Sequence, residues 1–232
     1  MDKYSFRLLK DQFPNIEFEQ RYFDSNDVNY VFRYTAYDGY LHILKWLMQF
    51  NPDVHAENDC AFRWAAGDGH LEVCEWLMQF SPDVHTINDF AFRYAAENGQ
   101  LEVCVWLMQF NPDVHVYNDE AFRWAACKGH LELCQWLMQF GPDVHAKKDY
   151  AFRYAAENGH IEVCEWLIQF NPDIHAENDE AFKWAAKNGH LHILKFLLEI
   201  DEDLIKLLDE KQLEKLMNYI ANQRKKSAKS SS

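Results

Sequence analysis

Apolar side chains lie on two sides of the helix predicted by the segment LEVCEWLMQF, which starts at Leu71. Leu71 and Cys74 belong to one apolar stripe, Val73 and Trp76 belong to a second, and Glu72 belongs to the single polar stripe. A helix that is apolar on two sides must be covered on both sides. We therefore expect this helix to lie between neighbouring structural units.

A short helix is predicted before it, from Asp59 to about Asp68. Asp59 is a suitable N-cap residue, Phe62 lies on the apolar face, and Gly69 can adopt the left-handed conformation that ends a helix. Asp59 and Arg63 are four positions apart, so we expect an ion pair that contributes about 0.2–0.5 kcal/mol.

This pair of helices recurs every 30 residues without an insertion. The string AFRWAA, or a close variant of it, begins at Val31, Ala61, Ala91, Ala121, Ala151 and Ala181. In five of the six units a capping residue and then a proline follow the second helix. The capping residues are Asn51, Ser81, Asn111, Gly141 and Asn171. One such unit cannot bury its own apolar faces, and stacking solves this problem. We expect six units over 31–200, an N-terminal capping half-repeat over 1–30, C-terminal capping helices over 201–222 and a disordered tail over 223–232.

The repeated strings resemble the ankyrin-repeat family, whose unit carries TPLHxAA, GHLEVVxxLL and GADVN. Here they read xAFRWAA, GHLEVCEWLM and SPDVH. The short period and the NDxAFRWAA wording are also similar to ankyrin proteins of large DNA viruses of amoebae. The resemblance implies an all-α, ankyrin-like α-solenoid of stacked helix-turn-helix repeats. Because the family period is near 33 residues, the hairpin connections are expected to be shortened. The family's TPLH histidine is replaced by Arg63 and its equivalents, which we expect to reach acidic side chains or carbonyls of the adjacent unit.

The formal net charge of −14 disfavours nucleic acid and anionic membranes as partners. No apolar run approaches the roughly 20 residues that span a bilayer, and the N-terminus does not resemble a signal peptide. We expect a cytoplasmic monomer, and the basic residues Arg224, Lys225, Lys226 and Lys229 leave a nuclear location open.

Cysteine and histidine follow the repeat, which favours structural roles over chemistry. Cys74 and its equivalents are expected to be small buried thiols, because stacked helices lie too far apart for disulfides. Cys60 and Cys127 are expected to be more exposed. The histidines form two ladders with one member per unit, which cannot converge on a metal ion. No phosphate loop, nucleophile elbow or zinc-protease motif occurs, so we expect no cofactor and no enzymatic activity.

Variation among the units concentrates just before the first helix and at its end. The candidate partner-binding residues at these positions are Ile87, Phe90, Tyr117, Glu120, Lys128, Lys147 and Tyr150. Apolar and aromatic groups with charges around them are typical of an interface. The alternative interpretation is that these rings simply cover the shortened turns.

The sequence therefore predicts a non-catalytic scaffold that binds a partner protein through the concave face of the solenoid. The alternative is an adaptor that recruits a cellular machine, such as a ubiquitin ligase, to a bound target.

Overall fold

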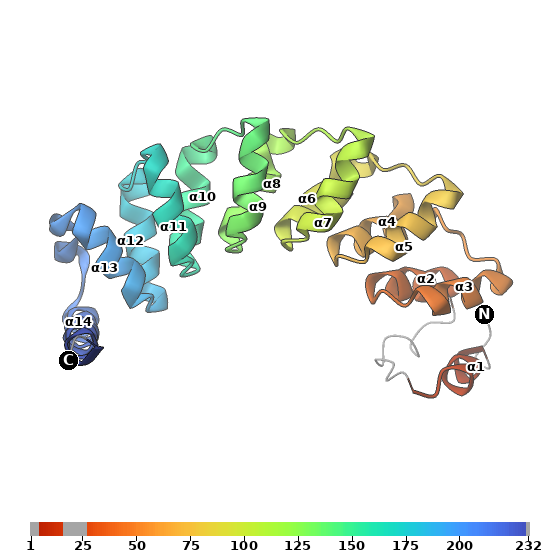
Figure 1. Cartoon of the computed structure of the whole chain (residues 1–232), viewed down its shortest axis with the longest axis horizontal. Helices are drawn as coiled ribbons and strands as arrows, with labels where there is room; N and C mark the ends of the chain where they lie inside the picture. Colours follow the sequence, from red (N-terminus) through yellow and green to blue (C-terminus); the bar gives the residue numbers. More distant parts are fainter. Residues whose placement is uncertain (1–4, 16–26, 231–232) are drawn as a thin grey trace. The chain divides into compact units, whose positions relative to one another are not determined.

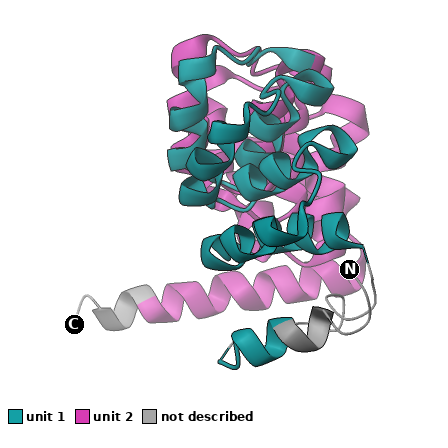
Figure 2. Ribbon diagram, turned by 90° about the vertical axis from the view of Figure 1, so that its right-hand side faces the viewer, with its two compact units in different colours: residues 1–116 teal, residues 117–232 magenta. Residues whose placement is uncertain are grey.

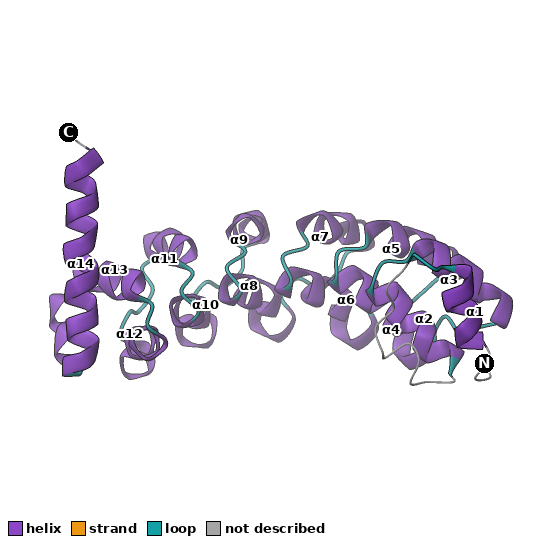
Figure 3. Ribbon diagram, turned by 90° about the horizontal axis from the view of Figure 1, so that it is seen from below, coloured by secondary structure: helices purple, strands orange, loops and turns teal. Residues whose placement is uncertain are grey.

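Helices account for all the regular secondary structure that the computed structural model describes, which covers residues 5–15 and 27–230 (Figure 3). The chain divides into two compact units, residues 1–116 and residues 117–232 (Figure 2). Each unit is a series of helix pairs, as the repeat predicts, and each is described by itself below.

The first unit contains three complete helix pairs and one additional helix (Figure 1). Its elements are α1 (Ser5–Gln12), α2 (Val28–Tyr37), α3 (Leu41–Leu47), η2 (Met48–Phe50), α4 (Ala56–Gly67), α5 (Leu71–Leu77), η3 (Met78–Phe80), α6 (Thr86–Glu97), α7 (Leu101–Leu107) and η4 (Met108–Phe110). The η elements are single 3-10 turns, and each one tightens the end of a second helix.

The second unit continues the same alternation and ends in a longer helix. Its elements are α8 (Val116–Cys127), α9 (Leu131–Leu137), η5 (Met138–Phe140), α10 (Ala146–Glu157), α11 (Ile161–Leu167), η6 (Ile168–Phe170), α12 (Ala176–Asn188), α13 (Leu191–Ile200), η7 (Glu202–Leu207) and α14 (Glu210–Ser230).

The repeats are joined by packing between their first helices and by contacts between aromatic rings. Helix α4 packs against α2 and α6, and α10 packs against α12. The alanine pair Ala65 and Ala66 is fully buried, and its small side chains let these helices approach closely. The ring of Phe62 lies 6.2 Å from the ring of Trp106 in the next repeat. The same contact joins Phe32 to Trp76 and Phe122 to Trp166.

The predicted ends of the helices are confirmed. Gly69 has φ +86°, and a Cβ at this position would lie only 2.3 Å from Oε1 of Gln100. Both facts require glycine there. The capping positions after the second helices, Asn51, Ser81, Asn111, Gly141 and Asn171, all adopt the left-handed conformation.

The predicted capping of the first helix by Asp59 is wrong, although the regular helix does start next to it. Helix α4 spans Ala56–Gly67, but Glu57, Asn58 and Asp59 all have left-handed φ and ψ angles, so the regular right-handed helix continues only from Cys60. Asp59 is therefore not an N-cap, because an N-cap residue has an extended backbone. Helices α6, α8, α10 and α12 contain the same left-handed triplet. Only α2 begins conventionally, with the Asp27 side chain accepting from the Asn29 amide.

Both ends of the series carry additional packing. Leu9 of α1 is fully buried, and the Phe13 ring lies 5.7 Å from the Trp46 ring. The rest of the proposed 1–30 cap lies partly outside the described residues, at 1–4 and 16–26. At the other end, η7 and α14 pack on α13 and bury Leu204 and Leu216.

Helix α14 continues through residues 223–230, where the sequence analysis expects a disordered tail. Residues 231–232 lie outside the described part of the chain. The segment is rich in Lys, Arg, Gln and Ala, which favour helix, and extending an existing helix avoids a new nucleation step.

Candidate protein-binding site

An arginine holds the left-handed triplet in each inner repeat. The Arg63 side chain donates from Nε to the Asn58 carbonyl at 2.9 Å and from Nη2 to the Glu57 carbonyl at 2.7 Å. Arg93, Arg123 and Arg153 make the same two hydrogen bonds in their own repeats. The arginine was expected to reach carbonyl groups of the adjacent unit, but it binds carbonyl groups of its own repeat instead. These bonds satisfy acceptors that the triplet removes from regular helical bonding.

The next repeat covers the outer face of this arginine with either an aromatic ring or a carboxylate. The guanidinium carbon of Arg63 lies 5.2 Å from the centroid of the Phe90 ring, and that of Arg123 lies 4.8 Å from the Tyr150 centroid. Arg153 instead forms an ion pair with Glu180, as predicted for an acidic side chain of the adjacent unit. Phe90 and Tyr150 therefore have a structural role as covers of a buried cation.

Tyr150 is further held by a neighbouring ring. Its ring is stacked on that of Tyr154, with centroids 3.9 Å apart and an interplanar angle of 18°. Burial of the phenol raises the pKa of Tyr150 above its ordinary value. The hydroxyl is thus neutral at physiological pH, and the residue acts by shape rather than by charge.

The aspartate of the triplet links successive repeats. Asp59 is buried, and its Oδ1 lies 2.6 Å from Nδ1 of His55 while its Oδ2 accepts from the Asp83 amide at 3.1 Å. Asp149 repeats this arrangement with His145 and the Asp173 amide. The predicted ion pair between Asp59 and Arg63 is not formed, because both side chains have these other partners. The histidine ladder at His55 is structural, as expected.

Ile87 and Tyr117 differ from the other candidates because their side chains are exposed. Ile87 is 46% exposed and Tyr117 is 52% exposed, and each occupies the first position of its left-handed triplet. Their φ angles are +55° and +54°. Left-handed backbone costs roughly 1–2 kcal/mol for a residue other than glycine, and it is least favourable for a β-branched residue such as Ile87. Both residues thus combine backbone strain with an exposed apolar group.

The remaining candidates occupy different places on the repeats. Ile87 and Phe90 lie in the first unit, and the other five lie in the second. Lys147 is exposed in the triplet of α10, and Glu120 is half-buried at the start of α8. Lys128 is exposed just beyond the C-terminal end of α8, whereas Tyr117 lies near its N-terminal end. The structure therefore does not place Lys128 beside the turn residues.

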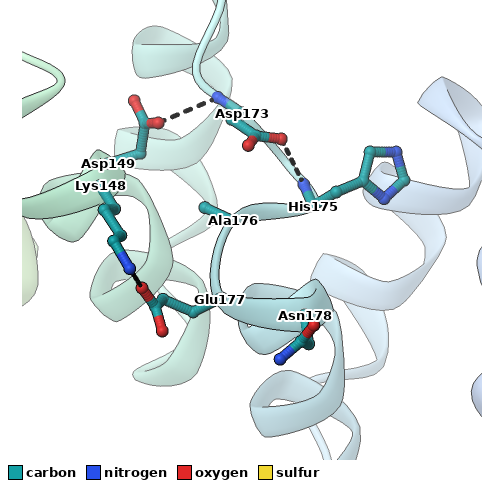
Figure 4. A pocket seen from close by; sticks show the side chains of 7 residues that line it. All are labelled: Lys148, Asp149, Asp173, His175, Ala176, Glu177 and Asn178. Carbon is teal, nitrogen blue, oxygen red and sulfur yellow. Dashed lines mark hydrogen bonds and ion pairs between the residues drawn. The ribbon is translucent and has the colours of Figure 1, made fainter.

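A polar groove lies between the turns of α10 and α12, with a volume of about 530 Å³ (Figure 4). Lys148 and Glu177 form an ion pair across it, and the Asp173 amide donates to Asp149. His175 lines the groove, and its hydrogen bond to Asp179 raises the pKa of its imidazole. The groove is thus the space around contacts that join two repeats.

The cysteines are inert. All six are buried, and none of them forms a disulfide. Cys60 and Cys127 are more exposed than the other four, as expected, but at 4% and 7% they too are buried. Burial raises the pKa of Cys134 to about 12, and it raises those of Cys74, Cys104 and Cys164 as well. These thiols carry no thiolate for nucleophilic chemistry.

The described residues contain no group of three or more histidine, cysteine or acidic side chains that could hold a metal ion. In the second unit, burial and then the neighbouring His130 and His190 lower the pKa of His160. None of the described helices is long and apolar enough to cross a membrane.

A family model for ankyrin repeats in three copies matches residues 32–118 and 122–206. The chain belongs to the ankyrin-repeat family. A search of curated proteins returned no match to it. The fold is accordingly an all-α ankyrin-type repeat solenoid, and ankyrin repeats are generally protein–protein interaction modules that are typically not enzymes. The likeness to proteins of amoebal viruses stays a prediction.

The left-handed triplet can now be compared with the corresponding part of the ankyrin repeat. The triplet occupies the position where the longer family repeat builds its hairpin, and no strand occurs among the described residues of this chain. Five repeats present this turn, and the side chain at its first position changes from one to the next: Glu57, Ile87, Tyr117, Lys147 and Glu177.

Proposed function

We propose that this ankyrin-repeat protein is a non-catalytic scaffold that binds a partner protein through the surface formed by its first helices and left-handed turns, the concave face in this family. Ile87 in the first unit and Tyr117 in the second each provide an apolar contact. The observation that carries the proposal is the exposure of these two apolar side chains on strained backbone.

Glycine or asparagine at the first triplet position would relieve the backbone strain, but the sequence has neither residue there. Glycine adopts the left-handed conformation at no steric cost, and asparagine tolerates it. The second triplet position holds asparagine in four of the five repeats, but the first never holds glycine or asparagine. Side chains retained at a costly position support a role in recognition.

The other candidates complete this surface in different ways. Lys147 supplies an exposed charge in the turn of α10, and Glu120 and Lys128 contribute further charges at the two ends of α8. Phe90 and Tyr150 support the turns by covering Arg63 and Arg123. A surface already held by such contacts loses little conformational entropy on binding, which favours affinity.

Net charge and thiol chemistry support the rest of the proposal. A net charge of −14 favours a protein partner over nucleic acid. Six buried thiols that form no disulfide support a reducing compartment such as the cytoplasm. Recruitment of a cellular machine, such as a ubiquitin ligase, to a bound target is the alternative function.

Comparative affinity capture tests the proposal. The intact chain and the double variant Ile87→Asn/Tyr117→Asn are used as baits in native-cell lysate, and bound proteins are quantified by mass spectrometry. Asparagine keeps the left-handed backbone and removes the apolar groups. Val105→Asn is the matched control, because Val105 is 50% exposed but lies on a second helix. A protein retained by the control and lost by the double variant supports the proposal. Equal capture by all three baits contradicts it.

A further inference from the structure

The C-terminal ends of the first helices in the first unit carry a row of aromatic rings. Tyr37 is the last residue of α2, and the centroid of its ring lies 6.1 Å from that of the Trp64 ring on α4. On α6, the ring of Tyr94 covers Gly67, where a Cβ would lie only 1.9 Å from a ring carbon. Tyr37, Trp64 and Tyr94 are half-buried, so each offers part of its ring to solvent.

Each of these helix ends also carries a half-buried carboxylate. Asp38 and Asp68 are the C-cap residues of α2 and α4, and Glu97 is the last residue of α6. The carbonyl groups at a helix C-terminus add partial negative charge. Arg63 and Arg93 lie at earlier positions of α4 and α6 and donate to carbonyls at the opposite ends of these helices.

These three rings and three carboxylates form the acidic edge of the first unit, which consists of Tyr37, Asp38, Trp64, Asp68, Tyr94 and Glu97. The segments that contain them, 34–40, 64–70 and 94–100, hold no lysine or arginine. The ends of α4 and α6 are neighbours, because the Asn98 side chain donates to the Gly67 carbonyl at 2.9 Å.

The equivalent positions of the second unit do not share this charge. Lys128 and Lys187 are exposed there, and Glu157 is the one acidic residue in the segments 124–130, 154–160 and 184–190. The aromatic position is kept, as Trp124, Tyr154 and Trp184. Both units are built from the same stacked helix pairs, so the stack does not require carboxylates at these positions. The acidic edge therefore has a cause other than folding.

Rings and carboxylates together favour a cationic side chain. The face of an aromatic ring attracts an ammonium or guanidinium group, and a carboxylate forms charge-assisted hydrogen bonds with it. An acidic segment would be repelled by the same surface. Charge and ring chemistry at the acidic edge are thus complementary to lysine and arginine.

We propose that the acidic edge binds a lysine- or arginine-rich segment of the partner protein. This inference rests on the proposed function, because it names the chemistry of a partner that the first helices bind. The net charge of −14 attracts such a segment from a distance, and the acidic edge determines where it docks.

Fluorescence anisotropy of a labelled oligolysine peptide with the full chain tests the proposal. A peptide of about ten residues spans at most about 35 Å, which is enough to cross three helices spaced by roughly 8–10 Å. The wild type is expected to bind oligolysine at physiological salt. Oligoglutamate of the same length is expected not to bind.

Two triple variants separate the acidic edge from general attraction to an acidic protein. The edge variant is Asp38→Asn/Asp68→Asn/Glu97→Gln. Asparagine already occupies the position of Asp38 and Asp68 in three other repeats, so the fold should tolerate it. The control variant, which removes the same number of exposed carboxylates from α5 and α7, is Glu72→Gln/Glu75→Gln/Glu102→Gln. Circular dichroism checks that both variants remain folded.

The edge variant is expected to bind oligolysine about tenfold more weakly than the wild type, because three carboxylate contacts are lost. The control variant is expected to stay within about twofold, since salt screens more distant charges. Tyr37→Ala, at a position that varies among the repeats, is expected to weaken binding by about threefold. The proposal is overturned if oligolysine does not bind, if both triple variants weaken binding equally, or if oligoglutamate binds as tightly. Unchanged affinity in Tyr37→Ala overturns the role of the rings.

The partner captured by the intact chain separates this inference from the proposed function. A partner lost by Ile87→Asn/Tyr117→Asn but retained in full by the edge variant leaves the scaffold role standing and overturns docking at the acidic edge. A partner lost by the edge variant alone supports the acidic edge and contradicts the role of Ile87 and Tyr117. Loss in both variants supports both.

Discussion

The guanidinium group of Arg123 lies beneath the ring of Tyr150, whereas Arg153, its equivalent one repeat later, meets the carboxylate of Glu180 at the corresponding position. One position in the repeat thus accepts two chemically different covers for the same buried cation. The arginine is the constant element, because it holds the left-handed turn through two carbonyls.

We expect the free energy of unfolding to show that an aromatic ring and a carboxylate are equivalent covers for Arg123. Tyr150→Ala removes a ring from a partly desolvated cation and should lower the free energy of unfolding by about 1–2 kcal/mol. Tyr150→Glu supplies the cover that Arg153 already uses, so it should cost less than half as much. Urea unfolding followed by circular dichroism measures both. Equal losses for the two variants would show that Arg123 does not depend on its cover.

Removing side chains at two exposed apolar positions should change stability in opposite directions. Ile87→Gly relieves left-handed strain and should raise the free energy of unfolding by about 1 kcal/mol. Val105→Gly places glycine in the interior of α7 and should lower it by about 1 kcal/mol. Thermal unfolding of the two variants beside the wild type gives the comparison. A loss of stability in Ile87→Gly would mean that the turn carries no strain at this position.

Much of the architecture follows from the sequence, because the 30-residue period, the glycine stops and the capping asparagines each have a local cause. The left-handed triplet could not be predicted in this way. The string Ile87-Asn88-Asp89 contains no glycine, and its conformation depends on two hydrogen bonds from Arg93, five and six positions further on. The recurrence of asparagine at the middle position was the one available signal, since asparagine tolerates this backbone.

The candidate binding residues were chosen because their positions vary among the repeats. A position can vary because its side chain is exposed or because different side chains cover the same arginine. Variation correctly marked Ile87 and Tyr117 as accessible, but it also marked Phe90 and Tyr150, whose variation reflects alternative covers for arginine. Cys127 looked accessible because its position varies, yet the next repeat buries it. Contacts between repeats that lie 27 to 31 residues apart cannot be recognised from local pattern.

The imidazole of His175 should titrate above its ordinary pKa. Its hydrogen bond to Asp179 is the main cause, followed by the other nearby carboxylates. Because the folded-state pKa is raised, His175 stabilises the fold fully below the unfolded pKa near 6.5, and the contribution is lost as pH rises through the folded pKa. NMR titration should show that Asp179→Asn lowers the His175 pKa and leaves that of His160, which burial lowers, unchanged. An unmoved His175 would contradict the assigned hydrogen bond.

The cysteine thiols should be unreactive in the folded protein. All six cysteines are buried, and burial raises the pKa of Cys134 to about 12. Ellman's reagent should therefore label none of them rapidly under native conditions and all of them after unfolding in guanidinium chloride. Rapid native labelling of Cys60 or Cys127 would show that the first helices open locally.

The central claim is that Ile87 and Tyr117 contact a partner protein, and its most direct test is an equilibrium dissociation constant. Isothermal titration calorimetry compares the captured partner's affinity for the wild type, Ile87→Asn/Tyr117→Asn and Val105→Asn. Loss of two apolar anchors, each worth at least about 1 kcal/mol, predicts affinity weaker by about thirtyfold in the double variant and unchanged in the control. An unchanged affinity in a double variant that remains folded would contradict the account.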